Sequence, residues 1–296
     1  MALAEASRQA TPPQRPTPFT SAGRHAIGAR ALNHPIRTVL AVYVVSRVVA
    51  LLALWIAATW FQNPAGVGHA DPGIGDLFGL WDGVWYERIV RDGYPVPLPV
   101  DADSGAVTYS AWAFYPLYPY LVKAVMLTGL SFTAAGVLLN VALGGLAAVL
   151  IWAVLRTGVH ADRQPQRERL ALVAACLWCF YPTTAVLLKP YTEALAVALV
   201  AGALLLMIRR RYVLVAVVAL PLGFTRGVAP ALGCAALIHL VVRWREDRAA
   251  GIRPLHGQRA GAVVMLAALG VSAVAWPVLA GLVTGVPTAF FDVQAA

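Results

Sequence analysis

The sequence has few charged residues and few cysteines. Only 12% of its 296 residues are charged and 59% are hydrophobic, whereas roughly a quarter of an ordinary soluble domain is charged. A soluble fold of this size would have too little polar surface to cover itself, so the composition predicts an integral membrane protein. The three cysteines, Cys176, Cys179 and Cys234, lie in apolar segments and are interpreted as small packing residues rather than a metal or redox site.

The first 37 residues lack an apolar segment. They contain five arginines and several prolines, which is typical of a disordered tail rather than of a cleavable signal peptide. The chain is therefore divided into a disordered basic cytoplasmic tail, 1–37, and a transmembrane domain, 38–296. This domain is expected to be incomplete at its C-terminus, because the sequence ends shortly after an apolar segment.

Apolar segments long enough to cross a hydrocarbon core of about 30 Å recur along the chain. The segment 212–242 would be about 46 Å long as one helix, and it contains Pro221, Gly223 and Pro230, so two short helices meeting at 224–227 are expected. The predicted fold is an all-α, polytopic membrane helical bundle of about seven spans: 38–61, 132–155, 169–188, 191–208, two within 212–242, and 260–283.

The basic residues form short clusters between these apolar segments. Segments 1–37, 156–169, 209–211 and 243–259 hold 17 of the 23 Lys and Arg residues. With about seven spans, these four segments fall on one side of the membrane, and the opposite loops hold only five. The positive-inside rule then predicts a cytoplasmic N-terminus in the plasma membrane. The net charge of +9 is thus explained by topology and does not indicate a nucleic-acid partner.

The first extracytoplasmic loop, about 62–131, is acidic and aromatic. Up to residue 113 it has seven acidic residues and only two arginines. An apolar stripe at helical spacing predicts an interfacial helix over residues 80–90: Trp81, Val84, Trp85 and Ile89. Asp82 would lie beside this stripe at the membrane boundary, where partial desolvation suits a general base. A surface acid without a catalytic role is the alternative.

Other charged residues lie within a span or at outward turns. Arg47 is near the middle of the first span, so it needs a partner, either a lipid phosphate or an acid such as Glu193. Lys189 and Arg226 lie at outward turns between helices, where a cation suits a phosphate. Snorkelling to the interface is the alternative for Lys189.

The order and spacing of several motifs resemble the PIG-V-type mannosyltransferases, the family that includes the enzyme adding the second mannose of the GPI anchor. The resemblance extends from about residue 40 to the end of the chain. The motifs that carry it are Ser46-Arg47, Trp81-Asp82-Gly83-Val84-Trp85-Tyr86, Gly93-Tyr94-Pro95, Ala113-Phe114-Tyr115-Pro116-Leu117-Tyr118-Pro119, Tyr191-Thr192-Glu193-Ala194-Leu195, Thr225-Arg226-Gly227, and Thr284-Gly285-Val286-Pro287 with Phe290 and Gln294.

The resemblance implies a GT-C glycosyltransferase fold and an inverting transfer of mannose from a polyprenyl-phosphate-mannose donor lipid. The acceptor would be an extracytoplasmic glycolipid, polysaccharide or protein. Carried over by position, Asp82 is the catalytic base and Arg226 binds the donor phosphate, with Arg47 and Lys189 as further phosphate ligands. The residues expected to line the substrate vestibule are Trp81, Trp85, Tyr86, Tyr191 and Glu193. The chemistry requires no cofactor or metal.

Two other functions remain open. A transporter or flippase for a lipid-linked or anionic substrate also has broken helices with charges at their ends. Such a protein should place several polar groups near mid-bilayer, whereas here they concentrate at the outward face. A non-catalytic membrane scaffold is the third reading. Asp101 and Asp103 have the spacing of a metal-binding pair, but the prolines before them indicate an exposed turn.

Overall fold

The computed structural model describes residues 32–61, 73–158, 164–252 and 256–296 of the chain. In these residues the regular elements are helices, apart from one antiparallel bridge between Val100 and Val107. The all-α prediction is confirmed for this part of the chain. The elements in chain order are α2 (Pro35–Ile56), η1 (Ala57–Phe61), α4 (Ile74–Gly79), α5 (Asp82–Asp92), η2 (Ala111–Ala113), α6 (Leu117–Met126), α7 (Phe132–Gly158), α8 (Gln164–Cys179), η3 (Pro182–Leu188), α9 (Glu193–Ile208), α10 (Tyr212–Leu222), α11 (Ala229–Ala249), α12 (His256–Thr284) and α13 (Ala289–Ala295).

Residues 1–31 of the predicted disordered tail, 1–37, lie outside the described residues. Its last residues are helical, because α2 begins at Pro35 with His34 in the N-cap position. Proline is well tolerated in the first turn of a helix, since the N–H that it lacks would have no partner there. The boundary predicted for the tail is therefore wrong by about three residues.

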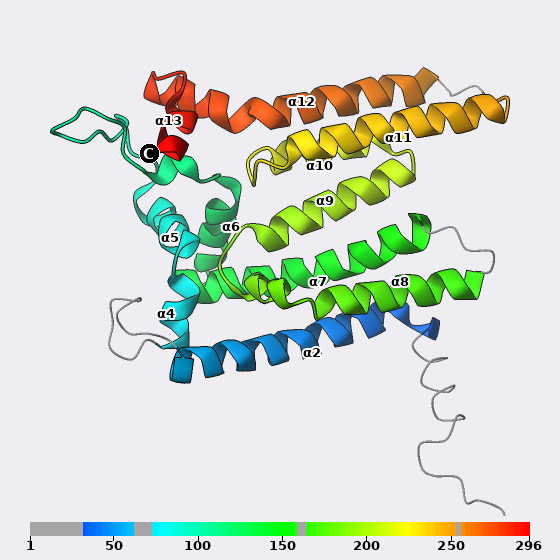
Figure 1. Cartoon of the computed structure of the whole chain (residues 1–296), viewed down its shortest axis with the longest axis horizontal. Helices are drawn as coiled ribbons and strands as arrows, with labels where there is room; N and C mark the ends of the chain where they lie inside the picture. The colour runs from blue at the N-terminus through cyan, green and yellow to red at the C-terminus, as the bar shows by residue number, and fades with distance from the viewer. Residues whose placement is uncertain (1–31, 62–72, 159–163, 253–255) are drawn as a thin grey trace, which may run out of the picture.

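The long helices lie side by side, with their axes roughly along the longest dimension of the molecule (Figure 1). α2 packs on α7 and α8, α7 on α9, α9 on α10, and both α10 and α11 on α12. The short helices α4, α5, α6 and α13 gather at one end, which we call the capped end. Helices α7, α9 and α11 finish at the opposite end, which we call the arginine end.

Within the residues that the structure describes, three helical segments are long and apolar enough to cross a membrane: Pro35–Phe61, Phe132–Gly158 and His256–Thr284. The pair α8 and η3, bent by 68°, makes a fourth if it forms one span. Helices α9 and α10 are apolar but have only 16 and 11 residues, fewer than the ~20 of a straight span. The chain thus has several helices fit to span a bilayer, and the count of about seven spans stays a prediction.

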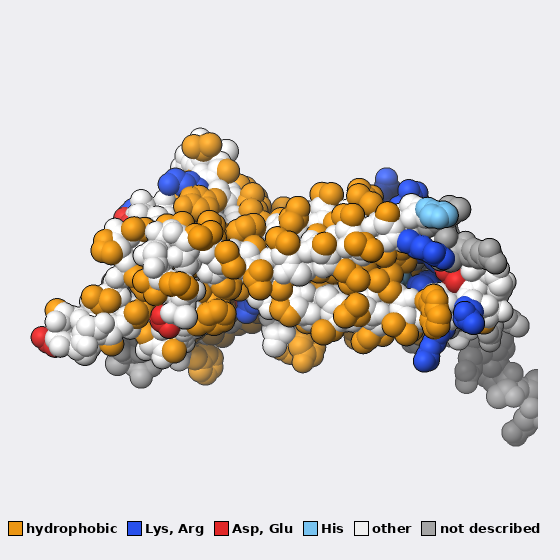
Figure 2. Space-filling model, turned by 90° about the horizontal axis from the view of Figure 1, so that it is seen from above, with side chains coloured by type: hydrophobic (Ala, Val, Ile, Leu, Met, Phe, Trp, Pro, Cys, Tyr) orange, Lys and Arg blue, Asp and Glu red, His pale blue; other side chains and the backbone are white. Residues whose placement is uncertain are grey.

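The surface of the bundle is apolar along its middle and basic at one end. Figure 2 shows hydrophobic side chains over most of the long helices and Lys and Arg side chains gathered at the arginine end. The exposed side chains include Val44, Leu138, Val217 and Val263, each at least half exposed. An apolar surface this extensive is costly in water and is what a lipid-facing bundle presents.

Two long apolar segments are broken, and each break has a local cause. The expected break within 212–242 is confirmed, since α10 ends at Leu222 and α11 begins at Ala229. At Gly223 a Cβ atom would come within 2.7 Å of the Ser272 backbone, so glycine allows α10 to approach α12 closely. The break between α8 and η3 was not predicted. It precedes Pro182, which disfavours helical backbone at the residue before it.

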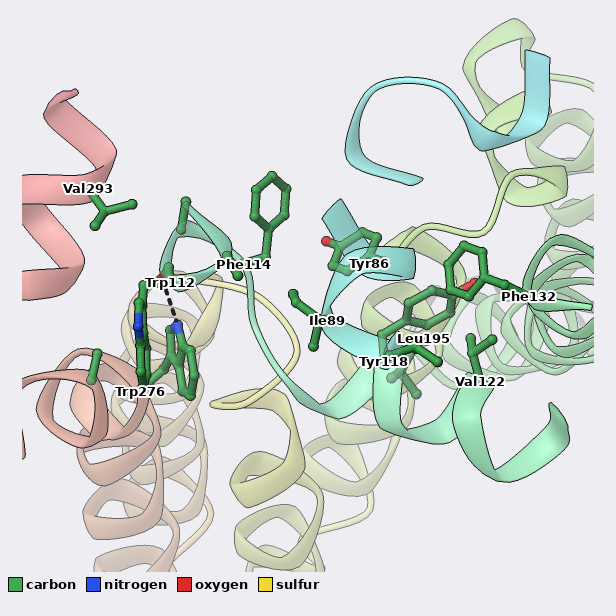
Figure 3. Packing of buried hydrophobic residues seen from close by; sticks show 14 of the residues in the cluster. Tyr86, Ile89, Trp112, Phe114, Tyr118, Val122, Phe132, Leu195, Trp276 and Val293 are labelled. Carbon is green, nitrogen blue, oxygen red and sulfur yellow. Dashed lines mark hydrogen bonds between the residues drawn. The ribbon is translucent and has the colours of Figure 1, made fainter. Parts of the chain in front are cut away.

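The largest core cluster lies at the capped end and joins the loop helices to the bundle (Figure 3). Tyr118 of α6 and Ile89 of α5 are fully buried there. The Trp276 ring of α12 stacks on the Trp112 ring at 5.4 Å, and the Trp276 indole N–H donates to the Trp112 carbonyl. This packing therefore ties α5 and α6 of the described part of the loop to α12.

Candidate active site

Helix α5 places Asp82 at the capped end of the bundle. A helix predicted over residues 80–90 is observed at Asp82–Asp92, and its place at the membrane interface stays a prediction. Tyr86, Ile89 and Val90 are buried on its inner side, while Trp81 is exposed, so the inner face only partly follows the predicted stripe. Trp81 precedes the helix with a φ of +55°. A bulky residue rarely adopts this strained conformation, which is often found at functional sites.

The Asp82 carboxyl is half-buried, and no donor in the described part of the chain hydrogen bonds to it. Burial raises the pKa of Asp82 above its ordinary value, the negative charge of Glu193 raises it further, and the positive charge of Arg226 lowers it. These influences show that Asp82 shares one electrostatic environment with Glu193 and Arg226. A carboxylate that is desolvated and free of hydrogen bonds is a stronger base than one in water.

Glu193 and Arg226 form an ion pair from two segments that are far apart in sequence. Arg226 Nη1 lies 2.6 Å from Glu193 Oε1 and 3.2 Å from Thr192 Oγ1. The Tyr86 side chain of α5 lies near these groups, since burial raises its pKa and the charges of Asp82, Glu193 and Arg226 also act on it. We call Asp82, Tyr86, Thr192, Glu193 and Arg226 the Asp82 cluster. It joins α5, the beginning of α9 and the break between α10 and α11.

The two acids and the arginine of the cluster are not fully satisfied by one another. The Arg226 side chain is 46% exposed, and its other guanidinium nitrogens have no partner among the described residues. The second carboxylate oxygen of Glu193, Oε2, is buried without a hydrogen-bond partner. Buried polar atoms are normally paired, so this oxygen marks a place where a further donor would be accommodated.

The turn before α9 is held against α7 by Asn140, a residue that we did not single out from the sequence. Asn140 is fully buried, and its amide donates to the Lys189 and Tyr191 carbonyls. At Gly136, one turn earlier, a Cβ atom would lie 2.5 Å from Pro190 Cβ. A buried polar residue in an apolar segment is itself a signal of function or assembly, and that signal was available in the sequence.

Tyr191 connects this turn to α5. Its hydroxyl donates to the Leu80 carbonyl at 2.6 Å. A Cβ atom at Gly83 would lie in ordinary contact with the Tyr191 ring, 3.5 Å from Cε1, so the start of α5 packs against Tyr191. Tyr191 therefore links the turn before α9 to the start of α5, beside the cluster.

Lys189 and Trp81 form a separate contact next to the cluster. Lys189 is 8% exposed, and its Nζ lies 3.9 Å from the centre of the Trp81 ring. Burial lowers the pKa of Lys189, and no carboxylate in the described residues forms an ion pair with it. The ammonium is thus stabilised by aromatic faces alone, which leaves it able to bind an anion.

Aromatic side chains border the cluster on the loop side. The Trp85 ring stacks on the Phe114 ring at 5.7 Å and meets the Tyr109 ring edge-on at 5.2 Å. Burial raises the pKa of Tyr109, and the charge of Asp82 raises it further. Burial also raises the pKa of Tyr115, against the lowering effect of the Arg226 charge. Both tyrosines therefore lie near the charged groups. Such a border of rings excludes water and suits a sugar face.

Arg47 lies elsewhere. Its guanidinium donates to the carbonyls of Cys179 and Thr184 and to the Thr184 hydroxyl, and Arg47 is 5% exposed. These carbonyls belong to the end of α8 and to η3, where helix breaks leave acceptors without partners. The expected pairing with Glu193 is wrong, because Glu193 binds Arg226. Arg47 contacts no member of the Asp82 cluster, so its observed role is to hold the α8 break together.

We therefore expect Arg47→Ala to lower the stability of the protein. The substitution removes the guanidinium's hydrogen bonds to two buried carbonyls, worth about 1.5–3 kcal/mol each, and leaves the Cys179 carbonyl with the Thr184 hydroxyl as its side-chain donor. Thermal unfolding of the detergent-purified protein should show a clear fall in melting temperature. Arg156→Ala, which removes a half-exposed arginine at the end of α7, is the control and should lower the melting temperature less. An unchanged melting temperature in Arg47→Ala would contradict this structural role.

The paired acids of the loop form a turn. Asp101 Oδ1 accepts hydrogen bonds from the Ser104 N–H and hydroxyl, both at 2.8 Å, and from the Asp103 N–H at 3.2 Å. These bonds lower the pKa of Asp101. Among the described residues no group of three or more His, Cys, Asp or Glu side chains is arranged to hold a metal ion. The two aspartates are therefore explained by turn formation.

Comparison of the chain with protein-family models, with curated proteins and with solved structures finds no match.

Proposed function

We propose that this protein is a membrane glycosyltransferase of the GT-C type that transfers mannose from a polyprenyl-phosphate-mannose donor to an extracytoplasmic acceptor. The observation that carries the proposal is the Asp82 cluster, in which a desolvated acid shares its surroundings with a half-exposed arginine beside an aromatic border. The resemblance of the motifs to those of the PIG-V-type mannosyltransferases supports the same roles for Asp82 and Arg226. The sugar, the donor lipid and the GT-C fold follow from that resemblance.

In the proposed mechanism Asp82 is the general base. An acceptor hydroxyl attacks the anomeric carbon of mannose from the face opposite the phosphate, and the configuration inverts. Asp82 takes the proton of that hydroxyl as the new glycosidic bond forms and the bond to the phosphate oxygen breaks. The raised pKa of Asp82 brings its basicity closer to the operating pH, which favours proton transfer. Polyprenyl phosphate is the other product.

Arg226 is the proposed ligand of the leaving phosphate. Nη1 is engaged by Glu193 and Thr192, which fixes the direction of the guanidinium while its remaining N–H groups face outward. A fixed cation at the point where negative charge develops lowers the barrier most effectively. Lys189 is a second candidate, since its buried ammonium has no acid partner in the described chain. Tyr191 then holds the start of α5 in place through its hydrogen bond to the Leu80 carbonyl.

The position of the cluster supports an active site at the membrane boundary. Helix α5, which carries Asp82, lies at the capped end, and the basic residues gather at the arginine end. By the positive-inside rule the arginine end is cytoplasmic and the capped end extracytoplasmic. A lipid donor in the outer leaflet would then present its phosphate at the level of Arg226.

The first test is the pH dependence of mannose transfer in the Glu193→Gln variant. Activity requires ionised Asp82, so kcat/KM rises with pH through the pKa of Asp82. Removing the negative charge of Glu193 lowers that pKa, and the acid limb of the profile should move to lower pH. Glutamine keeps a carbonyl for Arg226, so the geometry of the pair is retained.

Asp92→Asn, an exposed acid at the end of α5, is the control and should leave the acid limb unchanged. The assay uses membranes containing the protein, labelled polyprenyl-phosphate-mannose and an extract of membrane acceptors. An acid limb that stays in place or moves upward in Glu193→Gln would contradict the assignment of Asp82 as the titrating base. Absence of any transfer by the wild type would contradict the proposed function itself.

A further inference from the structure

A second cavity lies at the arginine end, far along the molecule from the Asp82 cluster. It has a volume of about 900 Å³ and lies between α11, α12 and the start of α10. Its polar wall consists of Arg210, Tyr212, Arg243, Trp244, Asp247, Arg248, Gln258 and Arg259. Nothing in the proposed transfer reaction uses this cavity, so it requires a separate explanation.

The arginines of the cavity outnumber its acids. Arg210 forms a two-pronged ion pair with Asp247, with N–O distances of 2.9 and 2.7 Å. Arg243 pairs with Glu246 at 2.8 Å, and Arg248 lies over the Trp244 ring at 5.7 Å. Arg259 has no partner among the described residues. Arg248 and Arg259 therefore remain as uncompensated positive charges at the mouth.

Two of these arginines occupy positions that local helix energetics disfavour. Arg259 is in the first turns of α12, where the partial positive charge of the helix end repels a cation. Arg210 follows α9 with a φ of +56°, a conformation in which glycine is usual. Topology accounts for basic residues at this end, and the charge of Arg210 is compensated by Asp247. Arg259, however, carries a charge that the α12 N-terminus disfavours, and both would attract a bound anion.

The opposite wall of the cavity is apolar. It is formed by Leu240, Ala262, Val263 and Leu266, and Val263 is 67% exposed on the lipid-facing surface. The cavity therefore continues from the arginines into the apolar side of the bundle. Trp244, which is also exposed, is typical of the boundary between bilayer and water.

We infer that this cavity binds an anionic phospholipid, with its phosphate between Arg248 and Arg259 and an acyl chain along Val263 and Leu266. Basic pockets between membrane helices on the cytoplasmic side are suited to such head groups. The apolar wall favours a lipid over a free phosphate ion, which would leave that wall in contact with water. The inference depends on the membrane location of the helices and is independent of the proposed glycosyltransferase activity.

Native mass spectrometry of the detergent-purified protein, titrated with phosphatidylglycerol or phosphatidylcholine, tests this site. Each arginine near an anionic head group contributes about a fivefold gain in affinity, so Arg248→Ala with Arg259→Ala should weaken phosphatidylglycerol binding roughly 30-fold. Arg245→Ala, which removes the same charge from α11 outside the cavity, is the matched control and should bind like the wild type. Asp82→Asn should also bind like the wild type.

Three outcomes would overturn the inference. In the first, the double variant binds phosphatidylglycerol as tightly as the Arg245→Ala control does. In the second, the wild type binds phosphatidylglycerol and phosphatidylcholine with equal affinity. In the third, inorganic phosphate binds the wild type as tightly as phosphatidylglycerol does. The last would identify a small-anion site. If the double variant does not fold, the single variant Arg259→Gln, at an exposed position, replaces it in the experiment. Its affinity for phosphatidylglycerol should fall about fivefold.

Discussion

Asp82→Asn is expected to reduce mannose transfer roughly 100- to 10,000-fold, the range over which a positioned general base acts. Asparagine has nearly the same shape but cannot accept the acceptor's proton. Because the Asp82 carboxyl makes no hydrogen bond with the described chain, the substitution should leave the fold intact. The measurement is the initial rate of transfer from labelled polyprenyl-phosphate-mannose in membranes, with kcat lowered and the donor KM nearly unchanged.

The control for this variant is Asp92→Asn on the same helix. Asp92 is at the exposed end of α5, where its side chain is 58% accessible and pairs with Arg91. It should transfer mannose at the wild-type rate. Equal activity of Asp82→Asn and Asp92→Asn, with both proteins present at wild-type levels, would remove Asp82 from the role of base.

Arg226→Gln is the second substitution for which we expect a large effect. Removing a preorganised group that stabilises developing charge lowers kcat roughly 100- to 1,000-fold. The donor KM should rise as well, since the phosphate is already charged in the bound donor. The acid limb of the pH profile should move to higher pH, because the positive charge of Arg226 lowers the pKa of Asp82.

Arg91→Gln controls for the loss of an outward-facing arginine, since its side chain is 68% exposed at the end of α5. It should leave kcat, donor KM and the acid limb at their wild-type values. If Arg226→Gln resembled this control in its use of the donor, the phosphate would have to be bound elsewhere. Lys189→Gln would then be the variant to compare.

The sequence indicated much of the helical order, because apolar segments and helix breakers act locally. The break between α10 and α11 followed from Pro221 and Gly223, and α5 from its apolar spacing. The bend between α8 and η3 was missed, since Pro182 lies inside a segment that was apolar enough for a straight span. What stabilises that bend is Arg47 of α2, a contact between residues more than a hundred positions apart.

For the candidate site too, some residues could be predicted from the sequence and some of their contacts could not. Asp82 and Arg226 were singled out from motifs, and the positive charge of Arg226 acts on the pKa of Asp82. Their roles as base and phosphate ligand stay predictions. The pairing of Glu193 with Arg226 rather than Arg47 was not predicted, because it depends on which helix ends meet at the capped end. Asn140, which holds the turn at Lys189 and Tyr191, was also missed, although an asparagine in an apolar helix is a recognisable signal.

The most direct measurement follows both products in vesicles containing the purified protein. The donor carries one label on mannose and another on the polyprenyl chain, and a membrane extract supplies acceptors. Our account predicts that mannose leaves the lipid, that one polyprenyl phosphate appears for each mannose transferred, and that Asp82→Asn and Arg226→Gln abolish both. Movement of the intact donor across the bilayer, with both labels still joined, would contradict it and identify a flippase.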